Sequence, residues 1–294
     1  VVSALYADTP TLLEVVRQVE AEPASEEDLL RVHTQAHLER IRNAVAHAEE
    51  TGKQVPLDGD TLVSGASWDA ALASAGCAIT ATALVLDGVS KTAFAASRPP
   101  GHHATADRAM GFCLFNNVAV AARWAQAERG VERVLIVDWD VHHGNGTQQI
   151  FYRDPSVYYL SLHLSPHYPG TGKESKRGAG EGEGTTRNVE LEAGTSAEAY
   201  MRAFEAALDA TLAEFAPELV LVSAGFDGLA GDPLGGLLLE PADMHALTTI
   251  LMERTRATAG SRIVAVLEGG YTPKRLGEGV VQVLRALGGV PPKD

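Results

Sequence analysis

The chain has 294 residues, of which 45% are hydrophobic, and its formal net charge at pH 7 is −14. This composition predicts a globular protein with enough chain for one large domain or two small ones. The negative charge argues against nucleic acid as a partner, because phosphate binding requires a basic surface. We expect no apolar run that approaches the roughly 20 residues of a membrane span, and hence no membrane partner. The two cysteines, Cys77 and Cys113, argue against a disulfide framework and favour a reducing, cytoplasmic location.

Strand-like and helix-like segments alternate along the chain. The first 50 residues favour helices, and Ser25 follows Pro23 as the expected N-cap of one of them. Further helices are predicted over 66–87, 117–129, 196–214, 241–258 and 274–287, and strands over 92–96, 134–137, 157–162, 219–222 and 263–267. Several of these strands lack polar alternation, which is typical of strands buried on both faces of a parallel sheet. We therefore expect an α/β fold with a central parallel sheet and no linker or repeat.

Four of the predicted strands run directly into polar clusters. These clusters occupy residues 98–103, 138–146, 223–227 and 268–271. Ligands of parallel sheets bind in the crevice beyond the carboxyl ends of the strands. Aspartate, histidine and tyrosine side chains from distant segments would therefore meet in one crevice, which predicts a hydrolytic metal site.

Three residues of these clusters are candidate metal ligands. Asp140 and His142 offer an oxygen and a nitrogen two positions apart, on one side of an extended segment. Asp227, at the end of another strand, is the natural third ligand. Three protein ligands with an open position are typical of a catalytic rather than a structural zinc site. The alternative is that these side chains only cap strand ends and hydrogen-bond the loops.

A hydrolytic site also needs an acid–base group and a donor for the developing oxyanion. The adjacent His102 and His103 can supply the acid–base role, and Asp138 and Asn145 can orient their imidazoles. Tyr271 follows two glycines that allow close backbone approach, so its hydroxyl is the candidate oxyanion donor. Taken alone, Tyr271 also fits an amphipathic core tyrosine.

Seven ordered motifs resemble the zinc-dependent histone deacetylase family, in particular its class II branch. The motifs are RPPGHHA at 98–104, GFCLFNN at 111–117, DWDVHHGNG at 138–146, SLH at 161–163, YPGTG at 168–172, AGFDGLAGDP at 224–233 and EGGY at 268–271. The similarity covers roughly residues 25–287, and chance does not readily produce such an ordered set. It implies an arginase-like α/β fold with a central eight-stranded parallel sheet, and hydrolysis of an acetyl or other acyl amide on an amine.

The resemblance assigns a role to each polar residue of the predicted crevice. It implies that Zn²⁺ is held by Asp140, His142 and Asp227, although the same ligand types are compatible with iron. It implies that His103 is the general base towards a metal-activated water and then the acid that protonates the leaving amine. Tyr271 would donate to the tetrahedral intermediate. The residues implied to orient or tune these groups are His102, Asp138 and Asn145.

The resemblance further implies a narrow channel for the acyl-lysine and a second cation. The channel would be lined by Gly111, Phe112 and Tyr168, where Tyr168 replaces the more usual Phe. A structural K⁺ is implied beneath the zinc, where it would help to compensate the charge of a buried loop. Its ligands would be the side chains of Asp138 and Ser161 and the backbone carbonyls of Asp140, His142 and Leu162.

Leu234 bears on the choice of substrate. Polyamine-selective relatives carry an acidic residue just after the Gly-Asp-Pro turn, where this chain has Leu234. Because leucine offers no partner for a second ammonium group, we expect an acyl-lysine peptide or protein as the substrate. An acetylated polyamine or other small acetylated amine is the alternative, with Asp58 or Asp60 as the acid. A catalytically silent acyl-lysine-binding protein is the alternative of another class, and it should have lost a metal ligand or Tyr271.

The amino terminus departs from the family pattern. Family members begin with an extra strand and a His-Pro-Glu-x-Pro-type loop, of which residues 8–10 are the nearest piece here. We expect residues 1–294 to form a single deacetylase domain whose amino-terminal part is truncated or whose rim is unusually open. His33 and His37 lie four residues apart without a Glu at position 34, so we expect structural roles for both. Cys113 is expected to be a buried small residue, and the sequence predicts no oligomeric state.

Overall fold

The computed structural model describes residues 3–4 and 11–293, so residues 8–10 lie outside the described part. The helices are α2 (Thr11–Val15), α3 (Glu26–Leu30), α4 (Gln35–Thr51), α5 (Ser67–Leu86), α6 (Asn117–Arg129), α7 (Asn145–Phe151), α8 (Ala197–Glu214), α9 (Pro241–Ala259) and α10 (Pro273–Leu287), with a 3₁₀ turn at Gly180–Gly182. The strands are β1 (Val55–Pro56), β2 (Leu62–Val63), β3 (Thr92–Ala95), β4 (Val134–Asp138), β5 (Val157–Leu164), β6 (Thr186–Leu191), β7 (Leu219–Ala224) and β8 (Ile263–Leu267).

The central sheet is fully parallel and has the strand order β3-β8-β7-β4-β5-β6. The expected α/β architecture is therefore confirmed, but the expected number of eight strands is wrong for the described residues, which contribute six. The two further strands, β1 and β2, have two residues each and pair antiparallel with each other. Their backbone groups are thereby used in a small hairpin instead of extending the sheet.

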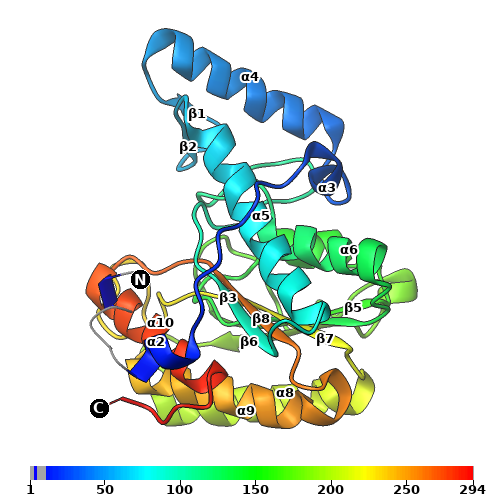
Figure 1. Ribbon diagram of the computed structural model, residues 1–294, viewed down its shortest axis with the longest axis vertical. Helices are drawn as coiled ribbons and strands as arrows, with labels where there is room; N and C mark the ends of the chain where they lie inside the picture. The colour runs from blue at the N-terminus through cyan, green and yellow to red at the C-terminus, as the bar shows by residue number, and fades with distance from the viewer. Residues whose placement is uncertain (1–2, 5–10, 294) are drawn as a thin grey trace.

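Helices cover both faces of the sheet. In Figure 1, α5 and α6 lie on one face and α8 and α9 on the other. Every residue of β4, β5, β7 and β8 is buried, as the apolar character of these segments predicts for strands covered on two sides. These strands are therefore packed along their whole length, and the predicted polar clusters follow at their carboxyl ends.

Helix α5 corrects one expectation from the sequence. By length and composition it is the one helix in the described part of the chain that could cross a membrane, although no such run was expected. Its Ala75 belongs to a hydrophobic cluster with residues of α3 and α4, whereas its Ala78 and Val85 belong to a cluster with residues of α6 and the central strands. A buried core helix passes the same length and composition test, so this feature is weak support for a membrane span.

A small subregion formed by α3, α4, β1 and β2 stands at one end of α5 in Figure 1. Ser25 caps α3 as expected, in a capping box with Asp28. The turn between β1 and β2 reaches the carboxyl-end loops of the sheet, because the Phe112 backbone N–H donates to Thr61 Oγ1 at 3.0 Å. This subregion therefore supplies part of the wall around the candidate site.

Candidate active site

The carboxyl ends of the central strands bring the predicted polar clusters together. In the parallel register, Asp138 at the end of β4 lies opposite Ser161 of β5 and Ser223 of β7. Ala224 of β7 lies opposite Leu267, the last residue of β8. The segments that follow β4, β7 and β8 therefore start at the same edge of the sheet, as parallel strands require.

Asp140, His142 and Asp227 form a buried cluster, called the metal group below. Their ligand atoms all lie within 4.8 Å of one another, and no other group of three or more His, Cys, Asp or Glu with this spacing occurs among the described residues. His142 Nδ1 lies 3.0 Å from Asp140 Oδ1 and 3.1 Å from Asp227 Oδ2. The structure thus brings all three sequence-predicted ligands together.

The donor set of the metal group fits a divalent cation. The second oxygen of each carboxylate is held by a backbone donor, since Gly269 N–H donates to Asp140 Oδ2 at 2.8 Å and Val141 N–H to Asp227 Oδ1 at 2.9 Å. One oxygen of each carboxylate is thereby directed at His142. A side chain at Gly269 would place its Cβ 2.1 Å from Asp227 Oδ2, so this approach requires glycine. One nitrogen and two oxygen ligands suit zinc and also iron.

The electrostatics of the metal group also favour a cation. Burial lowers the pKa of His142, but the two facing carboxylates outweigh burial and raise this pKa to about 10. Burial and the neighbouring Asp140 charge raise the pKa of Asp227 to about 7. Two buried carboxylates thus compete for a single positive charge, and a bound divalent cation would satisfy both.

The His102–His103 pair lies beside the metal group, and its two rings have different partners. Their centroids are 4.0 Å apart. His102 Nδ1 lies 3.1 Å from Asp138 Oδ2, which also accepts the Tyr159 hydroxyl at 2.9 Å. His103 Nδ1 donates to Asn145 Oδ1 at 2.8 Å. The orienting partners expected from the sequence, Asp138 and Asn145, are therefore in place.

These partners set opposite protonation states for the two histidines. Burial lowers the pKa of His102, but the charge of Asp138 outweighs burial and holds this pKa well above its ordinary value. Burial and the charge on His102 hold the pKa of His103 well below its ordinary value. His102 is thus held cationic, and His103 is held neutral with a ring nitrogen that can accept a proton.

Aromatic side chains surround the approach to the metal group. The Tyr168 ring lies perpendicular to His103 with centroids 5.1 Å apart, and the Phe112 ring meets Tyr271 edge-on at 5.9 Å. A Cβ at Gly111 would lie 2.3 Å from His103 Cδ2, so the chain can pass this ring only with glycine. Burial and the metal-group carboxylates raise the pKa of Tyr271, which keeps its hydroxyl protonated and able to donate.

Asp232 and His167, which both hydrogen-bond the backbone of Leu234, were not predicted as site residues. Leu234, 39% exposed, donates its N–H to Asp232 Oδ1 at 3.0 Å, and its carbonyl accepts from His167 Nε2 at 2.9 Å. Asp232 Oδ2 also accepts the Tyr271 backbone N–H at 2.7 Å. The His167 ring stacks on His142 with centroids 4.9 Å apart. Asp232 belongs to the AGFDGLAGDP motif, whereas no sequence pattern singles out His167.

Glu268 is a further residue that the sequence reasoning missed as part of the site. It directly follows β8 and is only 5% exposed. Its Oε2 accepts the backbone N–H groups of Gly101 at 2.6 Å and His102 at 3.1 Å. Its Oε1 accepts the Ser223 hydroxyl at 2.9 Å. The signal was present in the EGGY motif, where Glu268 was quoted only as part of the resemblance.

Other residues considered in the sequence analysis are not members of the metal group. His33 Nδ1–H donates to the Thr105 carbonyl at 3.0 Å, and His37 Nε2–H donates to the Leu114 carbonyl at 2.9 Å. These contacts fit the structural roles expected for both histidines. Cys113 is fully buried, and burial raises the pKa of its thiol, which agrees with its expected role as a small core residue. Ser161 Oγ, a predicted potassium ligand, lies 2.9 Å from His163 Nδ1.

The two acidic residues of the β1–β2 turn differ in their partners. Asp58 forms an ion pair with Arg108 at 2.6 Å. Asp60 is exposed and accepts the Thr61 hydroxyl at 3.1 Å, but it forms no ion pair with any residue that the structure describes. Burial first, and then the charges of Asp60 and Asp58, raise the pKa of Tyr168 to about 12. Asp60 is therefore the acid at this rim that is free to meet a cation.

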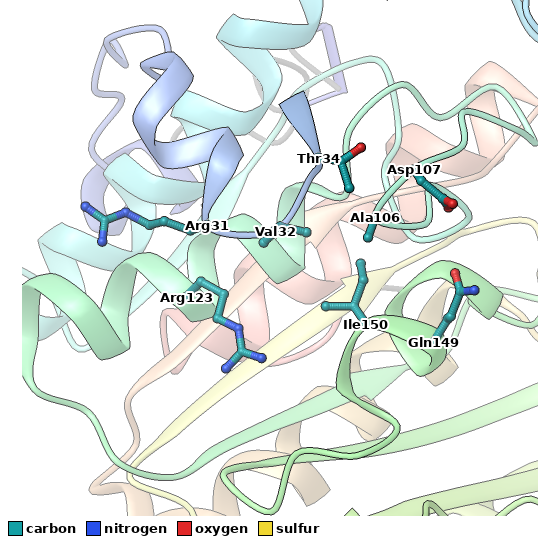
Figure 2. A pocket seen from close by; sticks show the side chains of 8 residues that line it. All are labelled: Arg31, Val32, Thr34, Ala106, Asp107, Arg123, Gln149 and Ile150. Atoms are coloured by element: carbon teal, nitrogen blue, oxygen red, sulfur yellow. The ribbon is translucent and has the colours of Figure 1, made fainter. Parts of the chain in front are cut away.

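A shallow hollow elsewhere on the surface is lined by different residues. Figure 2 shows Arg31 pointing away from Thr34 and Ala106, which lie on the opposite side of this hollow. Its two arginines are already ion-paired, Arg31 with Glu128 at 2.6 Å and Arg123 with Asp154 at 2.6 Å. The hollow therefore offers no unpaired arginine to a ligand, and its one acid, Asp107, accepts the Thr105 hydroxyl at 2.9 Å.

Comparisons with known proteins agree on one family. A model of the histone deacetylase domain matches residues 1–287. The chain is 42% identical over 271 residues to a histone deacetylase-like amidohydrolase of Pseudomonas aeruginosa, covering 92% of this chain and 70% of that protein. It is 39% identical over 284 residues to the chloroplastic histone deacetylase 10 of Oryza sativa subsp. japonica, covering 95% of this chain and 64% of that protein. A probable deacetylase of Archaeoglobus fulgidus is 40% identical over 263 residues, covering 89% of this chain and 71% of that protein.

A solved structure agrees as well. The crystal structure of an HDA15 HD domain matches with a TM-score of 0.90 and 36% identity, covering 99% of this chain and 81% of that one. The chain spans between 64% and 71% of the length of the three curated relatives named above.

Proposed function

Since the chain belongs to the histone deacetylase family, we propose that it is a zinc-dependent amidohydrolase that removes acetyl or other acyl groups from the side-chain amine of acyl-lysine. The observation that carries this proposal is the convergence of an Asp/His/Asp metal group, a neutral histidine and a protonated tyrosine at the carboxyl end of the sheet. A silent binding protein would not need this complete set, so hydrolysis is the better reading of the site.

The metal group would hold the zinc through one nitrogen and two oxygen ligands. When bound, zinc supplies a Lewis acid that polarises the amide carbonyl and lowers the pKa of a water molecule. Zinc is proposed over iron on the family's pattern, because the ligand types fit either metal. A potassium ion near Asp138 and Ser161 is a further proposal, supported by their opposed positions in β4 and β5.

His103 is proposed as the general base and then the general acid. Asn145 accepts from its Nδ1–H, which leaves Nε2 with a lone pair for the proton of the attacking water. The same proton can then pass to the leaving amine, because the nearby positive charge on His102 makes a second charge on His103 costly. His102, held cationic by Asp138, would therefore tune the basicity of His103 without exchanging a proton itself.

Tyr271 is proposed as the donor to the oxyanion that forms from the amide carbonyl. Its hydroxyl stays protonated because burial and the metal-group carboxylates raise its pKa. Such a donor acts where charge develops in the transition state, and its loss from comparable sites costs about 10²–10³ in rate. The rings of Phe112 and Tyr168 would flank the methylene chain of the substrate, next to the backbone of Gly111.

The second candidate substrate is an acetylated polyamine. Leu234 offers no charge to a second ammonium group, which favours acyl-lysine. Asp60, exposed and without an ion pair in the described residues, favours a substrate with a second positive charge instead. Asp58 is a weaker candidate for this contact, because Arg108 already neutralises it.

Acetate release by the zinc-loaded protein tests these readings. We expect faster turnover of an acetyl-lysine peptide than of N-acetylspermidine. The matched variants Asp60→Asn and Asp58→Asn distinguish the two acids of the β1–β2 turn. If Asp60 contacts the second ammonium group, only Asp60→Asn should lower the turnover of N-acetylspermidine relative to that of the peptide. Faster turnover of the polyamine would move the substrate assignment and leave the hydrolytic roles intact. No turnover of either substrate, with zinc bound, would favour the binding protein.

A further inference from the structure

Glu268 is a buried carboxylate at the carboxyl end of β8 that the proposed mechanism does not use. Its side chain accepts hydrogen bonds from three donors, namely the Gly101 and His102 backbone N–H groups and the Ser223 hydroxyl. The two carboxylate oxygens can accept all three of these hydrogen bonds. The side chain thereby joins the end of β8 to the end of β7 and to the loop that follows β3.

The His102 backbone is clamped from two sides. Its N–H, with that of Gly101, donates to Glu268 Oε2. Its carbonyl accepts from the N–H groups of Gly146 at 3.0 Å and Thr147 at 3.1 Å, in the first turn of α7. With both ends of this residue held, the directions in which the side chains of His102 and His103 leave the backbone are set.

We propose that Glu268 is a positioning residue, which fixes the Gly101–His102 backbone so that the two imidazoles meet Asp138 and Asn145 beside the metal group. The expected effect of Glu268 on turnover rests on the proposed function. Its expected effect on the position of the His102 ring does not. A displacement of about 1 Å in a catalytic group can lower a rate about 10²-fold, so a loosened clamp should be visible in kcat.

The opposite end of the sheet provides a matched control. Glu218 directly precedes β7, and its Oε2 accepts the backbone N–H groups of Glu132 at 2.7 Å and Arg133 at 3.1 Å. The two clamps therefore share the number and the spacing of their backbone donors. Glu218 holds the chain before β4, at the amino end of the strands, where none of the proposed site residues lies.

The test compares Glu268→Ala, Glu268→Gln and Glu218→Ala, each loaded with zinc. Three properties are measured: zinc content, kcat and KM for the better substrate, and the low-field proton resonance of the His102 ring N–H bonded to Asp138, assigned with His102→Ala. We expect Glu268→Ala to retain zinc, to lose about 30- to 100-fold in kcat with little change in KM, and to shift or broaden the imidazole resonance. Glu218→Ala should change none of the three.

Glu268→Gln separates positioning through hydrogen bonds from a role of the negative charge. Its amide oxygen can accept both backbone N–H groups, and the Ser223 hydroxyl can turn to accept from the amide nitrogen. We therefore expect the glutamine to restore most of the lost kcat, to within about 10-fold of the wild type, and to restore a sharp imidazole resonance near its original position.

Several results would overturn the proposal. One is a wild-type kcat with an unchanged resonance in Glu268→Ala. Another is a Glu268→Ala variant that loses both its zinc and its turnover. A third is a loss of kcat in Glu218→Ala as large as that in Glu268→Ala. If Glu268→Ala fails to fold, Ser223→Ala decides, because it removes one anchor of the carboxylate; an unshifted resonance and wild-type kcat there would count against the clamp. If the wild type turns over no acylated amine, the resonance still tests the clamp, and the two failures remain distinct.

Discussion

The two ends of the central sheet use the same hydrogen-bond pattern with opposite electrostatic results. Glu268 at the carboxyl end and Glu218 at the amino end each accept two adjacent backbone N–H groups. Burial raises the pKa of Glu268 to about 7. Burial also acts on Glu218, whose side chain is 33% exposed, but the N–H groups of Glu132 and Arg133 outweigh it and hold this pKa below its ordinary value. Burial, rather than the number of hydrogen bonds, decides the sign.

This difference extends to the neighbouring charges. At the carboxyl end, Asp138, Asp140, Asp227 and Glu268 are all buried, and no Lys or Arg in the described residues forms an ion pair with any of them. At the amino end, Glu218 pairs with Arg133 at 3.0 Å. Among the described residues, the ion-pair partners of these carboxylates are the imidazoles of His102 and His142, and a bound cation would add the positive charge for which Asp140 and Asp227 compete. The two ends of the sheet thus differ in both charge and burial.

The strongest way to break this comparison is to remove a carboxylate from the metal group. We expect Asp227→Ala to lose stoichiometric zinc and to lower acetate release by at least about 10³-fold, because two ligands do not hold zinc tightly and the chemistry depends on it. Zinc content after dialysis, measured by elemental analysis, checks the first part. Asp209→Ala, which removes an exposed acid paired with Arg254, is the control and should keep both. Full zinc occupancy in Asp227→Ala would overturn the ligand assignment.

Removal of the Tyr271 hydroxyl should have the next largest effect. Tyr271→Phe keeps the ring and its edge contact with Phe112, but it removes the proposed oxyanion donor. We expect zinc to stay bound and kcat to fall by about 10²–10³-fold, with little change in KM. Steady-state kinetics with the better substrate check this expectation. Tyr158→Phe, a change to a buried tyrosine whose hydroxyl contacts Glu214, should leave kcat unchanged. An unchanged rate in Tyr271→Phe would remove it from the mechanism.

The carboxyl end of the sheet was largely predictable from the sequence. The apolar strands at 134–137, 219–222 and 263–267 have a clear pattern, and the rule that ligands bind beyond the carboxyl ends of parallel strands places their polar followers together. The predicted pairing of Asp138 and Asn145 with the two histidines is also found. Strong periodic patterns and a topological rule were sufficient here, and the family resemblance agrees with the comparisons.

The remaining features depend on contacts between distant segments. Helix α7 begins inside the polar cluster at Asn145 and was not predicted, because glycine and asparagine there favour a loop by local preference. Edge strand β6 has mixed burial and therefore lacks a clear pattern. The eight-stranded sheet was carried over from the resemblance and is wrong for the described residues. The contacts of Glu268 with Gly101 and His102 join residues more than 160 positions apart, which no local pattern reveals.

The stability of the protein in acid should depend on His33, a buried histidine that contacts no carboxylate among the described residues, in contrast to His142 of the metal group. His33 is buried; its Nδ1–H donates to Thr105, and its Nε2 accepts the Asn116 N–H at 2.9 Å, so the neutral ring uses both nitrogens. Burial and the neighbouring His37 lower its pKa from 6.5 to about 3. The unfolded state therefore binds the proton first, and this contribution to stability is full above pH 6.5 and is lost as the pH falls towards 3.

We expect the protonation of His33 in the unfolded state to lower the free energy of unfolding by about 2 to 3 kcal/mol between pH 7.5 and pH 4.5. Chemical denaturation at several pH values measures it. His33→Gln, which keeps a donor and an acceptor, should reduce the slope between pH 6.5 and 4.5; His47→Gln, on exposed helix surface, is the matched histidine substitution for comparison. Equal slopes in His33→Gln and the wild type would mean that other groups cause the acid sensitivity.

The smallest expected effect lies at the amino-end clamp. Glu218→Ala leaves the N–H groups of Glu132 and Arg133 to water, which reaches this half-exposed site, so we expect a loss of only about 1 kcal/mol in unfolding free energy at pH 7. Because the folded-state pKa of Glu218 lies below its ordinary value of 4.5, its contribution is full above that pH and is lost as the pH falls further. The stabilities of wild type and variant should therefore converge in acid, as denaturation at pH 7 and pH 3 would measure. A gap that persists at pH 3 would mean that Glu218 acts through packing, and the parallel between the two clamps would then fail.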